Sequence, residues 1–475
     1  MSTPLSQEQK ITHFLNRTSF GPTLAGVQRV NRLGLRPYLD EQLRPNSLAD
    51  NLVEEKLAGL KTMRLSSREL IELYPPPQVA RQQAGQQGMT RQEMQPPRMI
   101  IVELQQARLL RSIYSQRQLF EVMVDFWSNH FNVFSAKGAD RWLTTAYDRD
   151  TIRPHALGKF RELLLATAQS PAMLFYLDNW LSASPDSPGA RLGGQNNRRR
   201  GLNENYAREL MELHTVGVDG GYTQKDVVEV ARCFTGWTIR QPHQRGEFVF
   251  EPRIHDNGEK IVMGTRIPAG GGGVEDGKKI IDLLARHPAT ARFIAQKLAR
   301  RFIADNPPAS IVDKAAETFR QSDGDIPSVL RTIIDSAEFF APEHYRAKVK
   351  KPLEYVASAV RALGAETQIT HQLFRYVGRM GEPLFLAQPP TGYPDVASSW
   401  ISPDMLLTRM NFAADLVGNR LPGSRVAPEA LKDKEAFLRL MAPDGLSAAT
   451  RAAIAESEGG QAIALAMAAP EFQRR

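Results

Sequence analysis

Apolar residues recur at helical spacing along most of this chain, and this pattern limits the fold more than any other feature of the sequence. The longest run covers roughly residues 100–131, where VELQQARLLRSIYSQRQLFEVMVDFWSNHF indicates one long helix. Between 246 and 264 the pattern alternates instead, and EFVFE and EKIVM flank the turn HDNG. The sequence therefore predicts a mainly α, multi-helix domain with one small β-hairpin at about residues 246–264.

We interpret residues 1–475 as one large helical domain that carries insertions. The segment 74–99 is rich in Pro, Gln and Arg and poor in large apolar residues, and 182–200 is rich in Ser, Pro, Gly, Asn and Arg. Such segments cannot bury enough apolar surface to hold one conformation, so both are predicted to be mobile insertions. A glycine-rich loop is expected at 268–277.

The basic residues are too scattered to suggest a nucleic-acid interface, although the formal net charge is +8. Dense spots occur at Arg198–Arg200, Arg300–Arg301 and Lys348–Lys351, and no aromatic residues interleave with them to stack on bases. The single cysteine, Cys233, excludes an intrachain disulfide and a cysteine-based metal site. Because Cys233 lies in the apolar run VVEVARCF, we expect it to be a buried, inert thiol.

The first residues, MSTPLSQEQKITHFLNRTSFGPT, contain neither the apolar stretch nor the small-residue cleavage site of a signal peptide. No apolar run approaches the roughly 18 residues of a membrane-spanning helix. As written, the chain is expected to be cytoplasmic and to have no membrane span. A start codon further upstream would leave room for an export signal.

The most informative segment is a predicted helix at 203–216, which Gly217 is placed to end. On a helical wheel Asn205, Glu209 and Glu212 lie within a narrow sector of the polar side, at spacings i, i+4 and i+7. Their oxygens can therefore converge on one point. Hard divalent cations prefer such oxygen ligands, and helical bundles build metal sites from facing carboxylates and histidines.

The same polar side has a structural interpretation that the sequence leaves open. Glu204 precedes Arg208 by four residues, and Arg208 precedes Glu212 by four, so both pairs are in ion-pair register. A solvated or internally paired face would explain these charges without a site. Asn205 favours the site, because asparagine is a poor helix former that prefers caps or buried hydrogen bonds.

Three histidines are candidates for ligands or proton carriers. His130 closes FWSNH among aromatic residues, with Asp125 and Asn129 as polar neighbours, and both a core role and a site role remain open. His214 lies on the apolar side of the 203–216 helix, where a packed histidine is expected. His255 precedes the turn Asp-Asn-Gly, whose turn chemistry does not require a histidine.

The long run RRRGLNENYARELMELHTVGVDGGYTQKDVVEVARCFTGW resembles the signature of the domain of unknown function 1800 (DUF1800) family of large bacterial proteins. The resemblance continues in order through FLNRTSFGPT, FWSNHF, PAMLFYLDN, HDNGEKIVMG and MGEPLFLAQPPTGYPD, and so covers nearly the whole chain. The positions of this sequence that match the family motif are His130, Asn203, Glu204, Asn205, Arg208, Glu209, Glu212, His214, Gly217, Asp219, Tyr222, Asp226, Trp237, His255 and Asp256.

The resemblance implies a mainly helical protein, and it implies no reaction. Members of the family are frequently exported and often occur beside a sulfatase-like protein, which makes such a protein a candidate partner. This sequence departs from many members because it carries no export signal. An extracytoplasmic role is therefore in doubt for this chain.

Two classes of function follow from these residues. The first is an enzyme, hydrolytic or oxidative, with a carboxylate and histidine site and a divalent metal (Mn, Fe, Mg or Ca) as its predicted cofactor. The residues assigned to catalysis are Asn205, Arg208, Glu209 and Glu212, and those assigned to metal binding are His130, Glu209, Glu212 and His255. The alternative is a non-catalytic assembly or binding protein in which the same polar cluster is structural and the basic loop 183–200 contacts an acidic partner.

Overall fold

The computed structural model describes residues 3–76, 96–188, 201–270, 272–368 and 371–475. Most of the two predicted insertions, at 77–95 and 189–200, lies outside the described residues. The described part of the chain is mainly helical, with three short two-stranded antiparallel sheets. Within that part no helix is both long enough and apolar enough to cross a membrane.

In the described residues of the first half of the chain, the regular elements are helices. Its α-helices are α1 (Gln7–Thr18), α2 (Leu24–Leu33), α3 (Leu35–Gln42), α4 (Asn51–Leu57), α5 (Ser67–Leu73), α7 (Arg98–Tyr114), α8 (Gln118–His130), α9 (Asp140–Ala146), α10 (Arg153–His155), α11 (Phe160–Gln169), α12 (Pro171–Tyr176), α14 (Asn205–Glu209) and α15 (Gln224–Phe234). Two π-helices are η3 (Tyr147–Ile152) and η5 (Leu210–His214), and short 3-10 helices are η1 (Pro45–Ser47), η2 (Lys61–Arg64) and η4 (Asn179–Leu181).

The second half adds the strands and the remaining helices. The strands are β1 (Trp237–Arg240), β2 (Glu247–Phe250), β3 (Lys260–Val262), β4 (Thr265–Ile267), β5 (Glu366–Thr367) and β6 (Ser424–Arg425). The α-helices are α16 (Val274–Arg286), α17 (Pro288–Phe302), α18 (Ala309–Gln321), α19 (Ile326–Ile334), α20 (Pro352–Ala362), α21 (His371–Arg379), α22 (Pro403–Val417), α23 (Pro428–Lys432), α24 (Lys434–Met441), α25 (Ala448–Ala455), α26 (Gly459–Ala468) and α27 (Pro470–Gln473). The 3-10 helices are η6 (Pro252–Ile254), η7 (Pro342–His344) and η8 (Ala397–Trp400).

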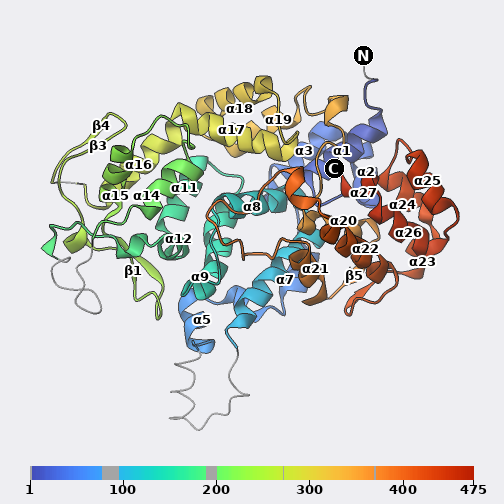
Figure 1. Ribbon diagram of the computed structural model, residues 1–475, viewed down its shortest axis with the longest axis horizontal. Coiled ribbons are helices and arrows are strands. Elements are labelled where there is room, and N and C mark those ends of the chain that lie inside the picture. The colour runs from blue at the N-terminus through green and yellow to red at the C-terminus, as the bar shows by residue number, and fades with distance from the viewer. Residues whose placement is uncertain (1–2, 77–95, 189–200, 271, 369–370) are drawn as a thin grey trace, which may run out of the picture.

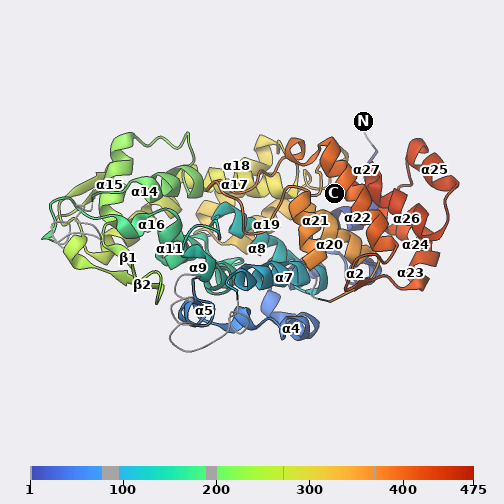
Figure 2. The same cartoon turned by 60° about the horizontal axis from the view of Figure 1, so that its bottom comes forward.

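The molecule is elongated, and helices from the middle of the chain occupy one end of it (Figure 1). Helices α11 to α16 gather at that end, while α22 to α27 gather at the other. Between them lie α7, α8, α9 and α20, and α4 and α5 lie against this central part on a further side (Figure 2). A main hydrophobic core runs from Ile11 on α1 to Phe472 on α27, while α4 and α5 pack in smaller, separate clusters.

The predicted long helix at 100–131 is two helices, α7 and α8, with a break at 115–117. Polar side chains stabilise the break. The Asp50 carboxylate accepts hydrogen bonds from the Ser115 hydroxyl and the Gln116 backbone N–H, both at 2.7 Å. The Gln118 amide donates to the carbonyls of Ser112 and Ser115, which the end of α7 leaves without helical partners. Because Asp50 comes from a distant segment, helical periodicity alone could not reveal the break.

The predicted β-hairpin was wrong in its pairing, although both of its segments form strands. EFVFE, as β2, pairs with β1, and the KIV of EKIVM, as β3, pairs with β4. Only Met263 and Gly264 connect β3 to β4, with φ of 47° and 79°, and positive φ at both positions suits a tight two-residue turn between antiparallel strands. The Asp256-Asn257-Gly258 turn instead follows η6. The predicted loop 268–277 is also shorter than expected, because 274–277 form the first turn of α16.

Candidate functional site

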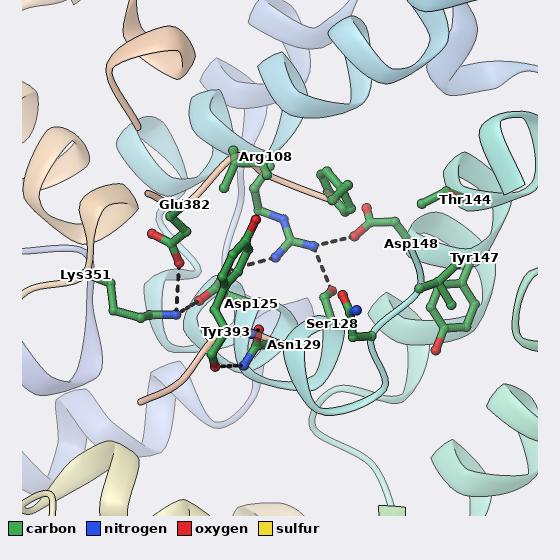
Figure 3. Close-up of a pocket in the computed structure, with 14 residues that line it drawn as sticks. Arg108, Asp125, Ser128, Asn129, Thr144, Tyr147, Asp148, Lys351, Glu382 and Tyr393 are labelled. Carbon is green, nitrogen blue, oxygen red and sulfur yellow. Dashed lines mark hydrogen bonds and ion pairs between the residues drawn. The ribbon is translucent and has the colours of Figure 1, made fainter. Parts of the chain in front are cut away.

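Buried charged residues gather around a cavity of about 50 Å³ in the central part of the molecule, here called the first cavity (Figure 3). Its lining comes from α7, α8 and the residues just after it, α9, the start of η3, the residue before α20 and the segment 382–393. The residues that line it are Arg108, Asp125, Ser128, Asn129, Asn132, Val133, Thr144, Tyr147, Asp148, Lys351, Glu382, Leu384, Phe385 and Tyr393.

Arg108 is the cation on one side of the first cavity. Its Nη2 donates to Asp148 Oδ1 at 2.6 Å and to Ser128 Oγ at 2.8 Å, and its Nη1 lies 3.3 Å from Asp125 Oδ1 (Figure 3). The guanidinium carbon lies 5.0 Å from the centre of the Phe385 ring. Burial alone would raise the pKa of Asp148, but Arg108, Arg153 and Arg111 together outweigh burial and hold that pKa below its ordinary value. Asp148 is therefore an ionised partner.

Lys351 is the second cation, and it lies between two carboxyl groups (Figure 3). Its Nζ is 3.0 Å from Asp125 Oδ2 and 3.4 Å from Glu382 Oε1. Burial lowers the pKa of Lys351, but Asp125 and Glu382 outweigh burial and raise it. Lys351 therefore stays protonated and bridges the two acids.

Glu382 is the acid with the altered ionisation. Glu382 is 2% exposed, and its Oε2 accepts a hydrogen bond from the backbone N–H of Leu353 at 2.8 Å. Burial and the neighbouring Asp125 carboxylate raise the pKa of Glu382 to about 7, although Lys351 and the Leu353 hydrogen bond oppose the shift. Two carboxyl groups that share one cation cannot both ionise easily, so the pair holds a proton close to neutral pH.

Two features of the backbone position these side chains. Asn129 exchanges two hydrogen bonds with the backbone of Tyr393, from its Nδ2 to the carbonyl at 2.8 Å and from the Tyr393 N–H to its Oδ1 at 2.7 Å. This pairing fixes the segment that carries Glu382 against α8. Tyr147 and Asp148 are the first residues of the π-helix η3, and π-helical turns are found frequently at functional sites.

The predicted helix at 203–216 changes period after Glu209, where α14 ends and the π-helix η5 begins. On its polar side Arg208 Nη2 pairs with Glu204 Oε2 at 3.3 Å and also donates to Gln224 Oε1 at 2.9 Å. Asn205 is exposed, and its side chain donates to the carbonyl of Leu177 at 3.2 Å. The ion-pair interpretation thus holds for Glu204 and Arg208.

Glu209 and Glu212 lie near each other, as their spacing predicted. Burial and the Glu212 charge raise the pKa of Glu209, while Arg208 lowers it. Neither carboxylate makes an ion pair with a residue in the described segments. Glu209 also helps, after burial, to raise the pKa of Tyr176, whose hydroxyl donates to the carbonyl of Gln388 at 2.8 Å. The two glutamates are therefore available to solvent or to a ligand.

His130 and His214 meet in the core. His130 Nε2 lies 3.1 Å from the carbonyl oxygen of His214, and the two rings are 6.0 Å apart between centroids. Nε2 therefore carries the proton and donates it to this carbonyl. The other nitrogen, Nδ1, is buried and has no hydrogen-bond partner in the described part of the protein. Burial, then Lys297, lowers the pKa of His130 well below its ordinary value, so the ring is neutral.

His255 belongs to a separate buried cluster. Its Nδ1 lies 2.7 Å from the carbonyl oxygen of Thr235, and its Nε2 lies 3.4 Å from Asp276 Oδ2. Lys260 Nζ also donates to Asp276 Oδ2, at 2.8 Å. Asp276 comes from the first turn of α16, within the segment predicted as a glycine-rich loop. His255 therefore ties the turn after η6 to α16.

The four predicted metal ligands are not gathered into one site. Within the described segments no three His, Cys, Asp or Glu side chains form a group that could hold a metal ion. The structure instead brings His130 to His214, Glu209 to Glu212 and His255 to Asp276.

The divalent metal stays a prediction that elemental analysis can test. The chain would be purified without chelator or affinity metal, alongside Glu209→Gln. The prediction requires stoichiometric Mn, Fe, Mg or Ca in the unaltered protein and its loss from the variant, because a carboxylate ligand would have become an amide. Equal trace amounts in both would contradict it.

Sequence reasoning missed most of the first cavity. In the sequence, Asp125 and Asn129 stand out only as polar neighbours of His130, and Lys351 only as one residue of a basic cluster. Glu382 and Tyr393 lie in MGEPLFLAQPPTGYPD, one of the runs that carried the family resemblance. That run and FWSNHF meet at the cavity. Both runs carry the family resemblance, and this was the one feature of the sequence that could have pointed to the site.

Comparison with known proteins identifies the family of this chain. No curated protein and no solved structure matches this chain. The family model described as "Protein of unknown function (DUF1800)" matches residues 13–474, which is nearly the whole chain. The protein therefore belongs to the DUF1800 family.

Proposed function

We propose that this protein is an enzyme in which the Asp125–Glu382 pair, held on Lys351, performs general acid–base catalysis. The observation that carries the proposal is the raised pKa of Glu382, about 7, in a carboxyl group that lines a cavity. A catalytic acid or base works best when its pKa lies near the working pH. A buried pair that holds one proton near neutrality can donate it from one carboxyl and accept it at the other.

The residues around the pair support this role. The Asp125 carboxyl group contacts Arg108 through Oδ1 and Lys351 through Oδ2, so both of its oxygens are held in place. The Leu353 N–H and Lys351 hold the Glu382 carboxyl in one orientation. A cavity of about 50 Å³ admits water or a small reacting group, since one water needs roughly 10–15 Å³ measured in the same way. The pair is thus positioned for proton transfer to or from a small group.

Glu382→Gln is expected to slow turnover by about 100-fold or more, because general acid–base catalysis contributes roughly 10²–10⁴. Glutamine keeps an oxygen for the Leu353 N–H but cannot take up or release the proton. The readout is mass spectrometry of a small-molecule extract of cells incubated with each protein. At least one compound should be consumed by the unaltered protein and spared by the variant. Glu435→Gln, at an exposed position on α24, is the matched control.

A second measurement keeps the proposal testable if Glu382→Gln folds poorly. Carbon-13 NMR of the glutamate carboxyl groups should show one resonance that titrates near pH 7. The proposal fails if no carboxyl titrates there, or if both proteins leave the extract unchanged.

A structural role is the second candidate, because Arg108 is paired with Asp125, Ser128 and Asp148 in a network that could simply fix helix packing. In that case the protein is the non-catalytic assembly or binding protein expected as the alternative. Glu382→Gln would then alter the melting temperature and no compound in the extract would change.

A further inference from the structure

A second cavity, of about 190 Å³, lies directly beside the first and shares Asn129, Lys351 and Tyr393 with it. Its size exceeds that of an engineered cavity of roughly 150 Å³ that binds benzene, so it can hold a small organic molecule or ion. The residues that line it are Phe126, Asn129, His130, Lys297, Arg300, Arg301, Lys351, Thr391, Tyr393, Pro394 and Asp395.

Two cations of this second cavity have no carboxylate partner in the described residues. Lys297 makes no ion pair there, and its ammonium lies 5.3 Å from the centre of the Phe293 ring. Arg300 donates from Nε to the carbonyl of Asp305 at 3.0 Å and likewise makes no ion pair. The one acid of the lining, Asp395, is already paired with Lys348 at 3.0 Å. The lining therefore carries two cations, Lys297 and Arg300, that have no ion-pair partner among the described residues.

Buried donors and acceptors of the same cavity are also unsatisfied. Arg301 is 2% exposed; its Nη2 lies 2.7 Å from Glu354 Oε1, while its Nε and Nη1 have no hydrogen-bond partner in the described part of the chain. His130 is 2% exposed, and its unpartnered Nδ1 is an acceptor because Nε2 donates to His214. Buried polar groups are nearly always satisfied in folded proteins, so these atoms point to a ligand.

We infer that the second cavity binds a small oxyanionic group, a carboxylate or a phosphate, through Lys297, Arg300 and Arg301. Guanidinium groups recognise both kinds of anion through paired N–H donors, and lysine adds a point charge. His130 Nδ1 accepts a hydrogen bond from a hydroxyl or amino group next to the anion. The inference rests on the proposed function in one respect: the anion would anchor a substrate whose reacting group lies at Asp125 and Glu382.

Isothermal titration calorimetry with sodium phosphate, sodium sulfate and sodium malonate, in a chloride buffer of fixed ionic strength, tests the binding. We expect one of these anions to bind with 1:1 stoichiometry and a Kd below about 1 mM. Lys297→Gln and Arg300→Gln should each weaken binding by about tenfold or more, because each removes a charge-assisted hydrogen bond. Lys432→Gln, at an exposed position on α23, should bind like the unaltered protein.

The three anions also identify the anionic group. Preference for phosphate over malonate assigns a phosphorylated substrate, and the reverse assigns a carboxylic acid. Absence of saturable binding, or equal binding by all variants, overturns the inference. Because the assay measures no turnover, its failure is distinct from failure of the proposed function: Glu382→Gln should still bind the anion.

Discussion

Lowering the pH from about 7 to about 5 should destabilise the fold steeply, because three histidines are buried and neutral in the folded protein. In the unfolded chain these histidines bind protons over this pH range, which favours unfolding. His13, His130 and His214 are each at most 2% exposed. Burial lowers the pKa of all three, and that of His214 falls to about 3. In the unfolded chain the pKa of each is about 6.5. Their contribution to stability is therefore fully present above about pH 6.5 and is lost as the pH falls towards 3.

The size of the effect follows from proton linkage. His214 alone should account for about 2 kcal/mol between pH 7 and pH 5, at roughly 1.4 kcal/mol per pH unit below 6.5. His13 and His130 add to the loss in the same direction. Glu382 partly offsets it, because the folded state takes up a proton near pH 7 and the cost of its buried charge is relieved as the pH falls.

Urea unfolding at about pH 7, 6 and 5 measures this dependence. His214→Leu should lose about 2 kcal/mol less than the unaltered protein over that range, since leucine cannot titrate. His371→Gln, at an exposed histidine on α21, is the control and should keep the full dependence. An unchanged pH dependence in His214→Leu would contradict the prediction.

Lys351→Met should reduce the free energy of unfolding by about 3–5 kcal/mol at neutral pH, because removing one member of a buried ion pair leaves uncompensated charge behind. Lys351 is 5% exposed and contacts both Asp125 and Glu382. Methionine has a similar shape and no charge, so lost packing contributes little. Part of the cost is relieved if Glu382 becomes fully protonated, and the loss should therefore be smaller at about pH 5.

The neighbouring residue Lys350 is a matched control. It is also buried, at 4% exposed, but among the described residues its ammonium donates only to Ser358 Oγ, and it lies 3.8 Å from the centre of the Phe472 ring. Burial lowers the pKa of Lys350 to about 7, which is opposite to the shift at Lys351. Lys350→Met should therefore change stability by less than about 1 kcal/mol or increase it. Chemical denaturation that ranks the two variants equally would rule out the ion-pair role of Lys351.

The helical class of this fold could be read from local patterns, because apolar spacing within a helix does not depend on partners. Cys233 is buried, and burial raises its pKa to about 12, as its apolar surroundings predicted. The break between α7 and α8 could not be predicted in this way, because it depends on Asp50 from another segment. The change to π-helical period after Glu209 was likewise invisible to a wheel drawn at one fixed angle.

The candidate site was harder to predict than the fold for the same reason. Periodicity predicts the face of a helix on which a side chain lies. It does not predict which residues of two distant segments lie side by side. Asp125 appeared beside His130 in the sequence, yet its charged partner Lys351 lies 226 residues further along. Glu209 and Glu212, by contrast, could be expected to lie near each other because they are close along one helix. Long-range pairing, which places Glu382 beside Asp125, had no local signature.

The long separations within the first cavity also govern when it can form. Asn129 pairs with Tyr393 across 264 residues, and Gln105 donates to Leu384 across 279. Closing loops of this length is entropically costly and slow, so such contacts belong to the late stages of folding. During synthesis Arg108 and Asp125 leave the ribosome long before Lys351, Glu382 and Tyr393 exist. The acid–base pair is therefore among the last parts of the protein to assemble. Until then Asp125 and Glu382 remain apart and exposed to solvent.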